Sequence, residues 1–78
     1  MDWKEIKLPH GSKLIKLHSF SFMLGGHSYS IEIDEFCDGT FTAHGEHSTD
    51  KNFVIESVSG KSLNECLSSL IKKIEERQ

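Results

Sequence analysis

The apolar residues between positions 62 and 77 recur with the period of an α-helix. Ser62 and Glu65 form a capping-box pattern, in which the serine hydroxyl accepts from the Glu65 amide and the glutamate carboxylate reaches back to the Ser62 amide. The pattern predicts a helix that begins within a residue of Ser62 and lays one apolar stripe on a flat surface. The stripe follows the spacing i, i+3, i+4, i+7, i+8 and i+11: Leu63, Cys66, Leu67, Leu70, Ile71 and Ile74.

The segment from Lys13 to Leu24 alternates apolar and polar residues, as a half-buried β-strand does. Its apolar positions change from odd numbers at Leu17 to even numbers at Phe20. Because successive side chains of a strand point to opposite faces, this change predicts a bulge or a break near residues 18–19.

Two consecutive glycines, Gly25 and Gly26, suit a two-residue hairpin turn, which requires positive φ angles. The strand that follows, residues 28–34, alternates cleanly between apolar and polar side chains. With this turn Phe22 lies opposite Tyr29, so the apolar positions of both strands point to the same face. The two patterns therefore predict an antiparallel hairpin.

The next turn allows two registers. A two-residue turn at residues 38–39 would place Phe41 on the polar face of the sheet. A three-residue loop with Gly39 in the left-handed conformation instead pairs Ile33 with Ala43 and keeps Phe41 on the apolar face. We predict the second register, because a register that breaks the burial pattern costs more.

The polar residues 44–51 predict a loop that begins inside or just after the third strand. A fourth extended segment follows over residues 53–58. The sequence thus predicts an α+β fold, with an antiparallel sheet of three to four strands and one C-terminal helix packed across one face. We expect residues 13–78 to form a single domain. Residues 1–12 form an N-terminal arm whose pattern is too short to distinguish a strand from a mobile tail.

Charge is divided unevenly along the chain, whose formal net charge is −3. Residues 1–18 carry four lysines against two acidic residues, whereas residues 19–78 carry five basic against ten acidic residues. The predicted domain is therefore acidic. Nucleic-acid-binding domains usually carry a basic patch, so direct nucleic-acid binding is not expected.

Three features that the sequence lacks indicate the cellular compartment of the protein. The chain starts without the basic residues and apolar stretch of a secretory signal, and no apolar run reaches the roughly 18 residues of a membrane span. Its two cysteines, Cys37 in a predicted turn and Cys66 on the helix stripe, do not make a disulfide framework. We expect a cytoplasmic protein with both thiols reduced and no membrane contact.

Two groups of residues carry candidate chemistry. Acidic residues crowd one strand and its turn, and paired carboxylates can hold Mg²⁺ or serve as acid and base. His44 and His47 lie three residues apart, with His27 and Cys37 elsewhere, but a structural zinc ion normally needs four ligands. No phosphate-binding loop or nucleophile motif completes either group. We therefore predict no catalysis, no metal and no cofactor. The acidic group is Glu32, Asp34, Glu35 and Asp38.

The polar face of the predicted sheet is rich in short hydroxyl side chains. Such side chains offer hydrogen-bonding groups with little rotamer entropy to lose, which suits a docking surface. We predict that a protein partner, or a second copy of the chain, binds this face or an exposed strand edge. The expected partner-binding residues are Ser30, Glu32, Thr40, Thr42 and His44.

The middle and end of the chain resemble the HicB-like family of small bacterial antitoxin-type domains. The match covers about residues 29–74 and is carried by a strand ending in acidic residues (Tyr29 to Glu35), a glycine turn (Asp38 to Phe41), and the helix entry from Gly60 to Leu67. Cys66 stands where the family has a small alanine, the family's Pro-rich segment is replaced by residues 44–51, and about 24 extra residues precede the match.

The resemblance implies a non-catalytic, partner-binding domain with a degenerate ribonuclease-H-like or related fold that neutralises a small RNA-acting partner. The appended DNA-binding element of many members is absent, so operator binding is not implied. A competing resemblance is to double-stranded-RNA-binding domains, which also end in three strands and a helix. Those domains carry a basic cluster where the last helix begins, whereas here only Lys61 stands beside Ser62.

Overall fold

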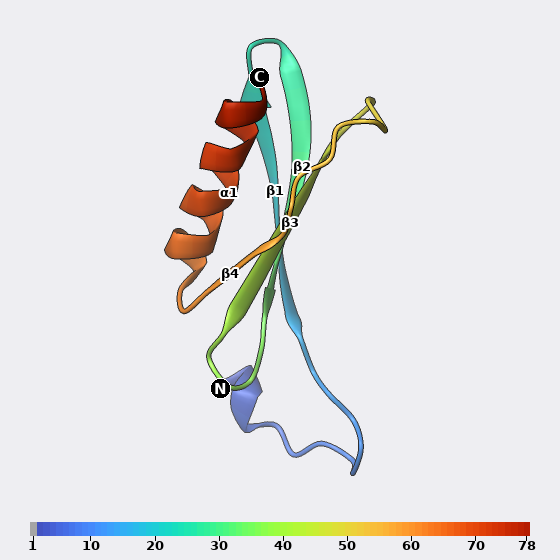
Figure 1. Cartoon of the computed structure of the whole chain (residues 1–78). Coiled ribbons are helices and arrows are strands. Elements are labelled where there is room, and N and C mark those ends of the chain that lie inside the picture. The colour runs from blue at the N-terminus through green and yellow to red at the C-terminus, as the bar shows by residue number, and fades with distance from the viewer. Residues whose placement is uncertain (1) are drawn as a thin grey trace.

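The fold is a four-stranded antiparallel sheet with one helix against it, and it confirms the α+β prediction (Figure 1). The structure, a computed structural model, describes residues 2–78. A 3-10 turn, η1 (Trp3–Glu5), precedes the sheet. The strands lie in the order β1-β2-β3-β4, which is also their order in the sequence. They are β1 (Lys16–Leu24), β2 (His27–Glu35), β3 (Phe41–His47) and β4 (Val58–Gly60), and the helix is α1 (Leu63–Arg77).

The first hairpin has the predicted turn and register. Gly25 and Gly26 have φ angles of 58° and 80°, and Phe22 pairs with Tyr29. The predicted bulge near residues 18–19 is wrong, because β1 pairs with β2 without interruption from Lys16 to Leu24. The change of apolar parity instead places Leu17 on the polar face of the sheet, where its side chain stays exposed.

The second turn also follows the predicted register. Gly39 has a φ angle of 89°, and the Phe36 amide donates to the Thr40 carbonyl at 2.9 Å. Ile33 therefore pairs with Ala43, and both side chains are fully buried. A three-residue loop closed by a left-handed glycine thus sets the position of β3 against β2.

The segment after β3 differs from the prediction at both ends. β3 continues to His47, so the first part of the predicted loop is strand, and the Ser48 amide still donates to the Ser28 carbonyl at 2.9 Å. Of the predicted fourth extended segment, only the end pairs with β3, since β4 begins at Val58. Phe53 and Ile55 pack against the core from outside the sheet.

α1 lies across β2, β3 and β4, and its predicted apolar stripe faces the sheet. The Ser62 hydroxyl accepts from the Glu65 amide at 3.1 Å, as predicted, but the Glu65 carboxylate accepts from the Lys61 amide, at 3.4 Å. Gly45 of β3 lies directly under the helix, because a Cβ atom there would be 3.2 Å from Leu70 Cδ2. The buried core is Tyr29, Ile31, Ile33, Ala43, Cys66, Leu70 and Ile74.

The N-terminal arm lies at the end of the sheet farthest from the C-terminus of α1 (Figure 1). There Lys4 of η1 makes an ion pair with Glu35 at the end of β2, with 3.1 Å between Nζ and Oε2. The pair ties residues of the arm to the sheet. Within residues 2–78 no helix has the length and apolar character needed to cross a membrane.

Candidate functional site

The two faces of the sheet differ because, in the described part of the chain, a helix packs on only one of them. α1 packs on one face, and among the described elements no other packs across the sheet. Because opposed residues of an antiparallel sheet point to the same face, the pairings assign the strand residues of the other face, which we call the open face. These are Leu17, Ser19, Ser21, Met23, Ser28, Ser30, Glu32, Asp34, Thr42, His44, Glu46 and Ser59.

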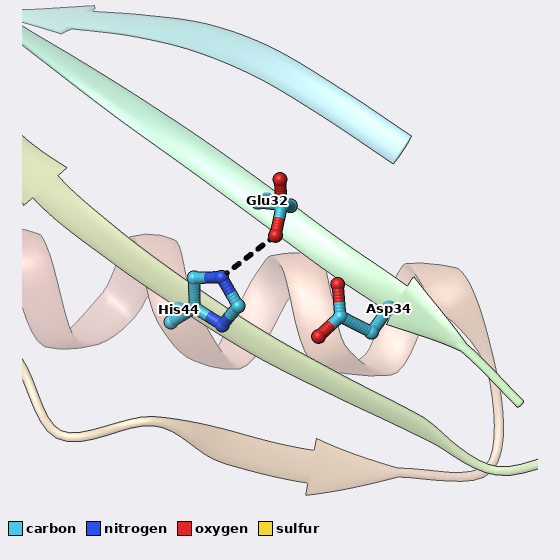
Figure 2. Close-up of side chains that lie close together, drawn as sticks. All are labelled: Glu32, Asp34 and His44. Carbon is cyan, nitrogen blue, oxygen red and sulfur yellow. Dashed lines mark hydrogen bonds and ion pairs between the residues drawn. The ribbon is translucent and has the colours of Figure 1, made fainter. Parts of the chain in front are cut away.

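A polar cluster lies at the centre of the open face (Figure 2). Glu32 and His44 are directly opposed on β2 and β3, and His44 Nε2 is 3.0 Å from Glu32 Oε2. Asp34 lies beside them, and one ligand atom from each of the three residues falls within 4.8 Å of the others. Asp34 Oδ1 is shielded from solvent and has no hydrogen-bond partner. The cluster therefore joins two carboxylates and an imidazole in one place.

The sequence predicts Glu32 and His44 on the same polar face, but it does not predict that they share one chemical site. Glu32 and Asp34 were assigned to an acidic group, and His44 was grouped with His47. The signal that joins them was available, since the register that pairs Ile33 with Ala43 also sets Glu32 opposite His44. The cluster joins residues that are distant along the chain, so it depends on the pairing of β2 with β3.

The cluster supplies only part of the ligand set that a bound metal ion needs. Three ligands are one short of the usual structural zinc site, and the side chains of His44 and Glu32 are 49% and 39% exposed. The contact between Glu32 and His44 also gives each of these groups a hydrogen-bond partner without an ion. The expectation that no metal is bound stays a prediction.

The polar cluster borders a shallow hollow in the open face. The hollow is lined mainly by serine and acidic side chains of the first three strands, and several of these are exposed. Hydroxyl, carboxylate and imidazole groups can accept hydrogen bonds there, and the serines can also donate them. The polar lining residues are Ser19, Ser21, Ser30, Glu32, His44 and Glu46.

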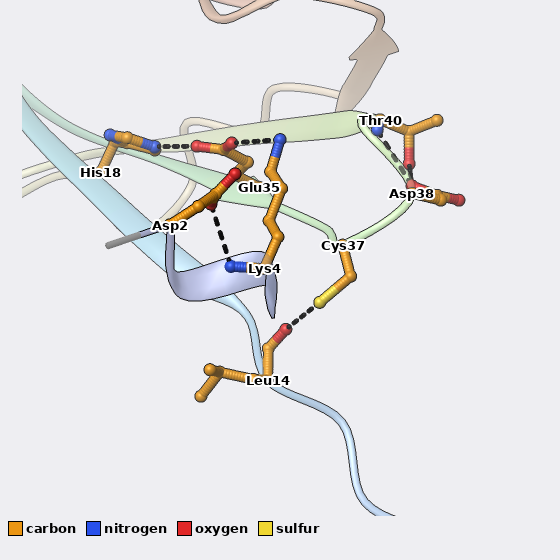
Figure 3. Close-up of polar contacts among 8 residues, drawn as sticks. All are labelled: Asp2, Lys4, Leu14, His18, Glu35, Cys37, Asp38 and Thr40. Carbon is orange, nitrogen blue, oxygen red and sulfur yellow. Dashed lines mark hydrogen bonds and ion pairs between the residues drawn. The ribbon is translucent and has the colours of Figure 1, made fainter. Parts of the chain in front are cut away.

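Four of the five predicted partner-binding residues share the open face: Ser30, Glu32, Thr42 and His44. Thr40 does not join them, because it precedes β3 and bonds to Asp38 in the turn. Its hydroxyl and its amide donate to the Asp38 carboxylate at 2.6 and 2.9 Å, and these bonds hold the pKa of Asp38 below its usual value (Figure 3). Thr40 therefore stabilises the turn.

His27 and His47 lie on the helix side of the sheet. His27 Nδ1 is 3.0 Å from His47 Nε2, and His47 Nδ1 accepts the amide hydrogens of Thr49 and Asp50. Since one nitrogen of His47 accepts, the other carries the proton and donates to His27. This arrangement fixes the loop after β3. It also separates His47 from His44, which belongs to the opposite face.

A second polar group joins the arm to the sheet (Figure 3). His18 Nε2 is 2.9 Å from Glu35 Oε1, and the hydrogen bond from His18, followed by the contact with Lys4, lowers the pKa of Glu35. Nearby, the Cys37 thiol donates to the Leu14 carbonyl at 3.5 Å. These contacts are structural, because each one connects residues before β1 or at its start to the end of β2 or to the turn after it.

Comparisons of the chain with protein-family models, with curated proteins and with solved structures each found no match.

Proposed function

We propose that this protein is a non-catalytic protein-interaction module, acting in the manner of HicB-like antitoxin domains. Its docking surface is the open face of the sheet. The observation that carries the proposal is the position of α1, which packs on one face of the sheet and leaves the opposite face to mostly polar side chains. The serine and threonine side chains of this face lose little rotamer entropy when a partner orders them.

The charge of the open face selects the class of partner. Three acidic residues, Glu32, Asp34 and Glu46, lie among its strand residues, and none of those residues is a lysine or an arginine. An acidic face attracts a basic surface and speeds the encounter. RNA-binding proteins present basic surfaces, because they must neutralise phosphates. The favoured partner is therefore a small, basic, RNA-acting protein, which the module neutralises by covering its RNA-binding surface.

The proposal places the module in the cytoplasm. Cys37 is exposed and Cys66 is buried, and both are unpaired. An exposed unpaired thiol is better tolerated in a reducing compartment.

The test compares three purified baits in extracts of the native host, with captured proteins identified by mass spectrometry. The first bait is the unaltered protein. The second carries Glu32→Lys and Thr42→Lys on the open face. The third carries Ser68→Lys and Glu75→Lys, two exposed positions of α1, and it changes the net charge by the same amount.

The proposal is supported if the first and third baits capture one basic protein that the second bait does not capture. This protein, once purified, must also bind the purified, unaltered module. Retention of that protein by the open-face variant would show that the wrong surface was chosen. Duplex RNA provides the competing outcome in a gel-shift titration. Tight, salt-dependent binding of the RNA would favour the double-stranded-RNA-binding alternative, and turnover of a substrate would overturn the non-catalytic assignment.

A further inference from the structure

The edge strand β1 exposes apolar side chains on both of its faces. Leu17 and Met23 lie on the open face with 58% and 75% of their surface accessible, and Phe20 lies on the helix side with 36% accessible. α1 does not cover β1, since its contacts are with β2, β3 and β4. Within residues 2–78, therefore, no helix or strand packs over these three side chains.

The free edge of β1 also presents unpaired backbone groups. The Ser48 amide bonds to the Ser28 carbonyl, so the backbone of Ser28 is turned toward β3. Met23 lies opposite Ser28 in a pair that exchanges no hydrogen bonds, and its N–H and C=O groups point away from β2. By the two-residue period of a strand, Leu17, Ser19 and Ser21 point the same way.

Edge strands in native proteins usually carry a feature that prevents pairing. β4, at the other edge, is only three residues long. β1 has nine residues, no proline, and one lysine or acidic residue, Lys16 at its end. The two edges of the sheet therefore differ, and β1 has the properties of a strand that pairs with another chain.

We propose that β1 pairs with β1 of a second copy of this chain, antiparallel and about a twofold axis at Phe20. This register sets Leu17 against Met23 of the partner copy, Ser19 against Ser21, and Phe20 against Phe20. Every exposed apolar side chain of β1 then meets an apolar side chain, and the two serines meet each other. Such a twofold interface is isologous, so one strand supplies both halves.

Backbone geometry agrees with this register. The residues that point their backbone groups outward are odd-numbered, and the register pairs odd with odd, so Leu17 and Ser19 exchange hydrogen bonds with the copy's Met23 and Ser21. Moving the axis to Ser19 or Ser21 keeps the hydrogen bonds but pairs fewer residues. Either move also leaves Leu17 without an apolar partner, because Leu17 then lies opposite Ser21 or Gly25 of the copy. The axis at Phe20 is the one that pairs all nine residues of β1.

The dimer joins two sheets into one of eight strands, with both open faces on the same side, because opposed residues share a face. It does not depend on the proposed function, since the free edge and the open face are different surfaces. A strand pair of this length falls at the lower end of specific interfaces, which bury about 1,200 Å² in total. We therefore expect a reversible dimer with a dissociation constant in the micromolar range.

Analytical ultracentrifugation of the full chain from 1 μM to 1 mM tests the dimer with three variants. Ser19→Pro removes an N–H that β2 does not use, and Met23→Lys places a charge against Leu17 of the copy. Each should raise the dissociation constant at least tenfold. Val54→Lys is the matched control, because Val54 is 63% exposed and lies outside the sheet, and it should leave the constant unchanged. Circular dichroism checks that each variant folds.

Single cysteines test the register in a Cys37→Ser background, which removes the exposed native thiol. Phe20→Cys should form a disulfide dimer on mild oxidation, because the axis brings its Cα atoms to about 4.5 Å. Ser19→Cys and Ser21→Cys report the two shifted registers and should cross-link poorly. A monomer at 1 mM would overturn the proposal. So would a dimer that both Ser19→Pro and Met23→Lys leave intact, or cross-linking strongest at either serine position.

Discussion

β1 and β2 are adjacent strands of equal length, yet their environments differ. On the helix side of β2, Tyr29, Ile31 and Ile33 are at most 2% exposed, whereas Phe20 on the same side of β1 is 36% exposed. Both strands alternate apolar and polar residues in the sequence. Alternation therefore identifies a strand with two different faces, but it does not show which strands the rest of the chain covers.

The width of a helix explains the difference. A helix with its side chains is about 10–12 Å across, and neighbouring strands lie about 4.8 Å apart. One helix therefore covers between two and three strands of a four-stranded sheet. α1 lies over the β2–β4 side, so β1 is the strand left outside the core.

A charged residue introduced into the core and one introduced on β1 should give the largest difference in the free energy of unfolding between the two regions. Leu70→Asp puts an unpaired carboxylate into the fully buried core, and we expect a loss of about 4–5 kcal/mol, which is enough to unfold a domain of this size. Met23→Asp on β1 should change the free energy of unfolding by about 0.5 kcal/mol or less. Chemical denaturation of dilute protein measures both. If Leu70→Asp kept a cooperative melt within a few degrees of the parent, α1 would not form the core.

A larger side chain introduced into each region should give the second largest difference in stability. Gly45→Val forces a branched side chain against Leu70 under α1, and overpacking of this kind costs about 1–3 kcal/mol. Ser21→Val adds the same type of side chain to the exposed face of β1, where valine suits a strand and has room. Thermal unfolding in dilute solution should show a lower midpoint for the first variant and an unchanged or slightly higher one for the second. Equal effects would mean that α1 does not press on β3.

The smallest effect concerns Glu35, at the end of β2 that contacts the N-terminal arm. The folded protein lowers the pKa of Glu35 below its ordinary value of 4.5, through His18 first and Lys4 second. Its ionised form therefore stabilises the fold above that value, and the stabilisation is lost as the pH falls through the lowered pKa. Glu35→Gln should cost up to about 1 kcal/mol at pH 7 and nothing once the pH is well below 4.

Urea denaturation of the parent protein and the Glu35→Gln variant at several pH values tests this prediction. Lys4→Gln should reproduce part of the effect, because it removes one of the two contacts of Glu35. A difference in the free energy of unfolding between the parent and the Glu35→Gln variant that stayed constant from pH 7 to pH 3 would contradict the assigned cause.

The local rules that predicted the fold succeeded where neighbouring residues decide the structure. The two glycine turns set both hairpin registers, and Ser62 set the start of α1. The rules failed where distant packing decides. Leu17 suggested a bulge because we assumed that every apolar residue of β1 faces the core. Residues 44–47 suggested a loop because their helix-side positions hold a glycine and a histidine instead of large apolar side chains.

The candidate site, like the fold, could be predicted only in part from the sequence. Four open-face residues followed from alternation, whereas the hydrogen bonds that occupy Thr40 depend on the conformation of the turn. The cluster of Glu32, Asp34 and His44 required the pairing of two strands, and the exposed apolar edge required the position of α1. These features depend on contacts between segments, which no single stretch of the sequence specifies.

The strand order also has a consequence for synthesis of the chain. Each strand forms beside the one made just before it, so β1, β2 and β3 can pair while the rest is still being translated. The apolar face of these strands stays uncovered until α1 has been made, because the 30 residues from 48 to 77 must first be added to the chain. At 5–20 residues per second this takes about 1.5–6 s. During that interval the nascent sheet exposes its future core beside an unpaired edge, and it is then that a chaperone would be needed.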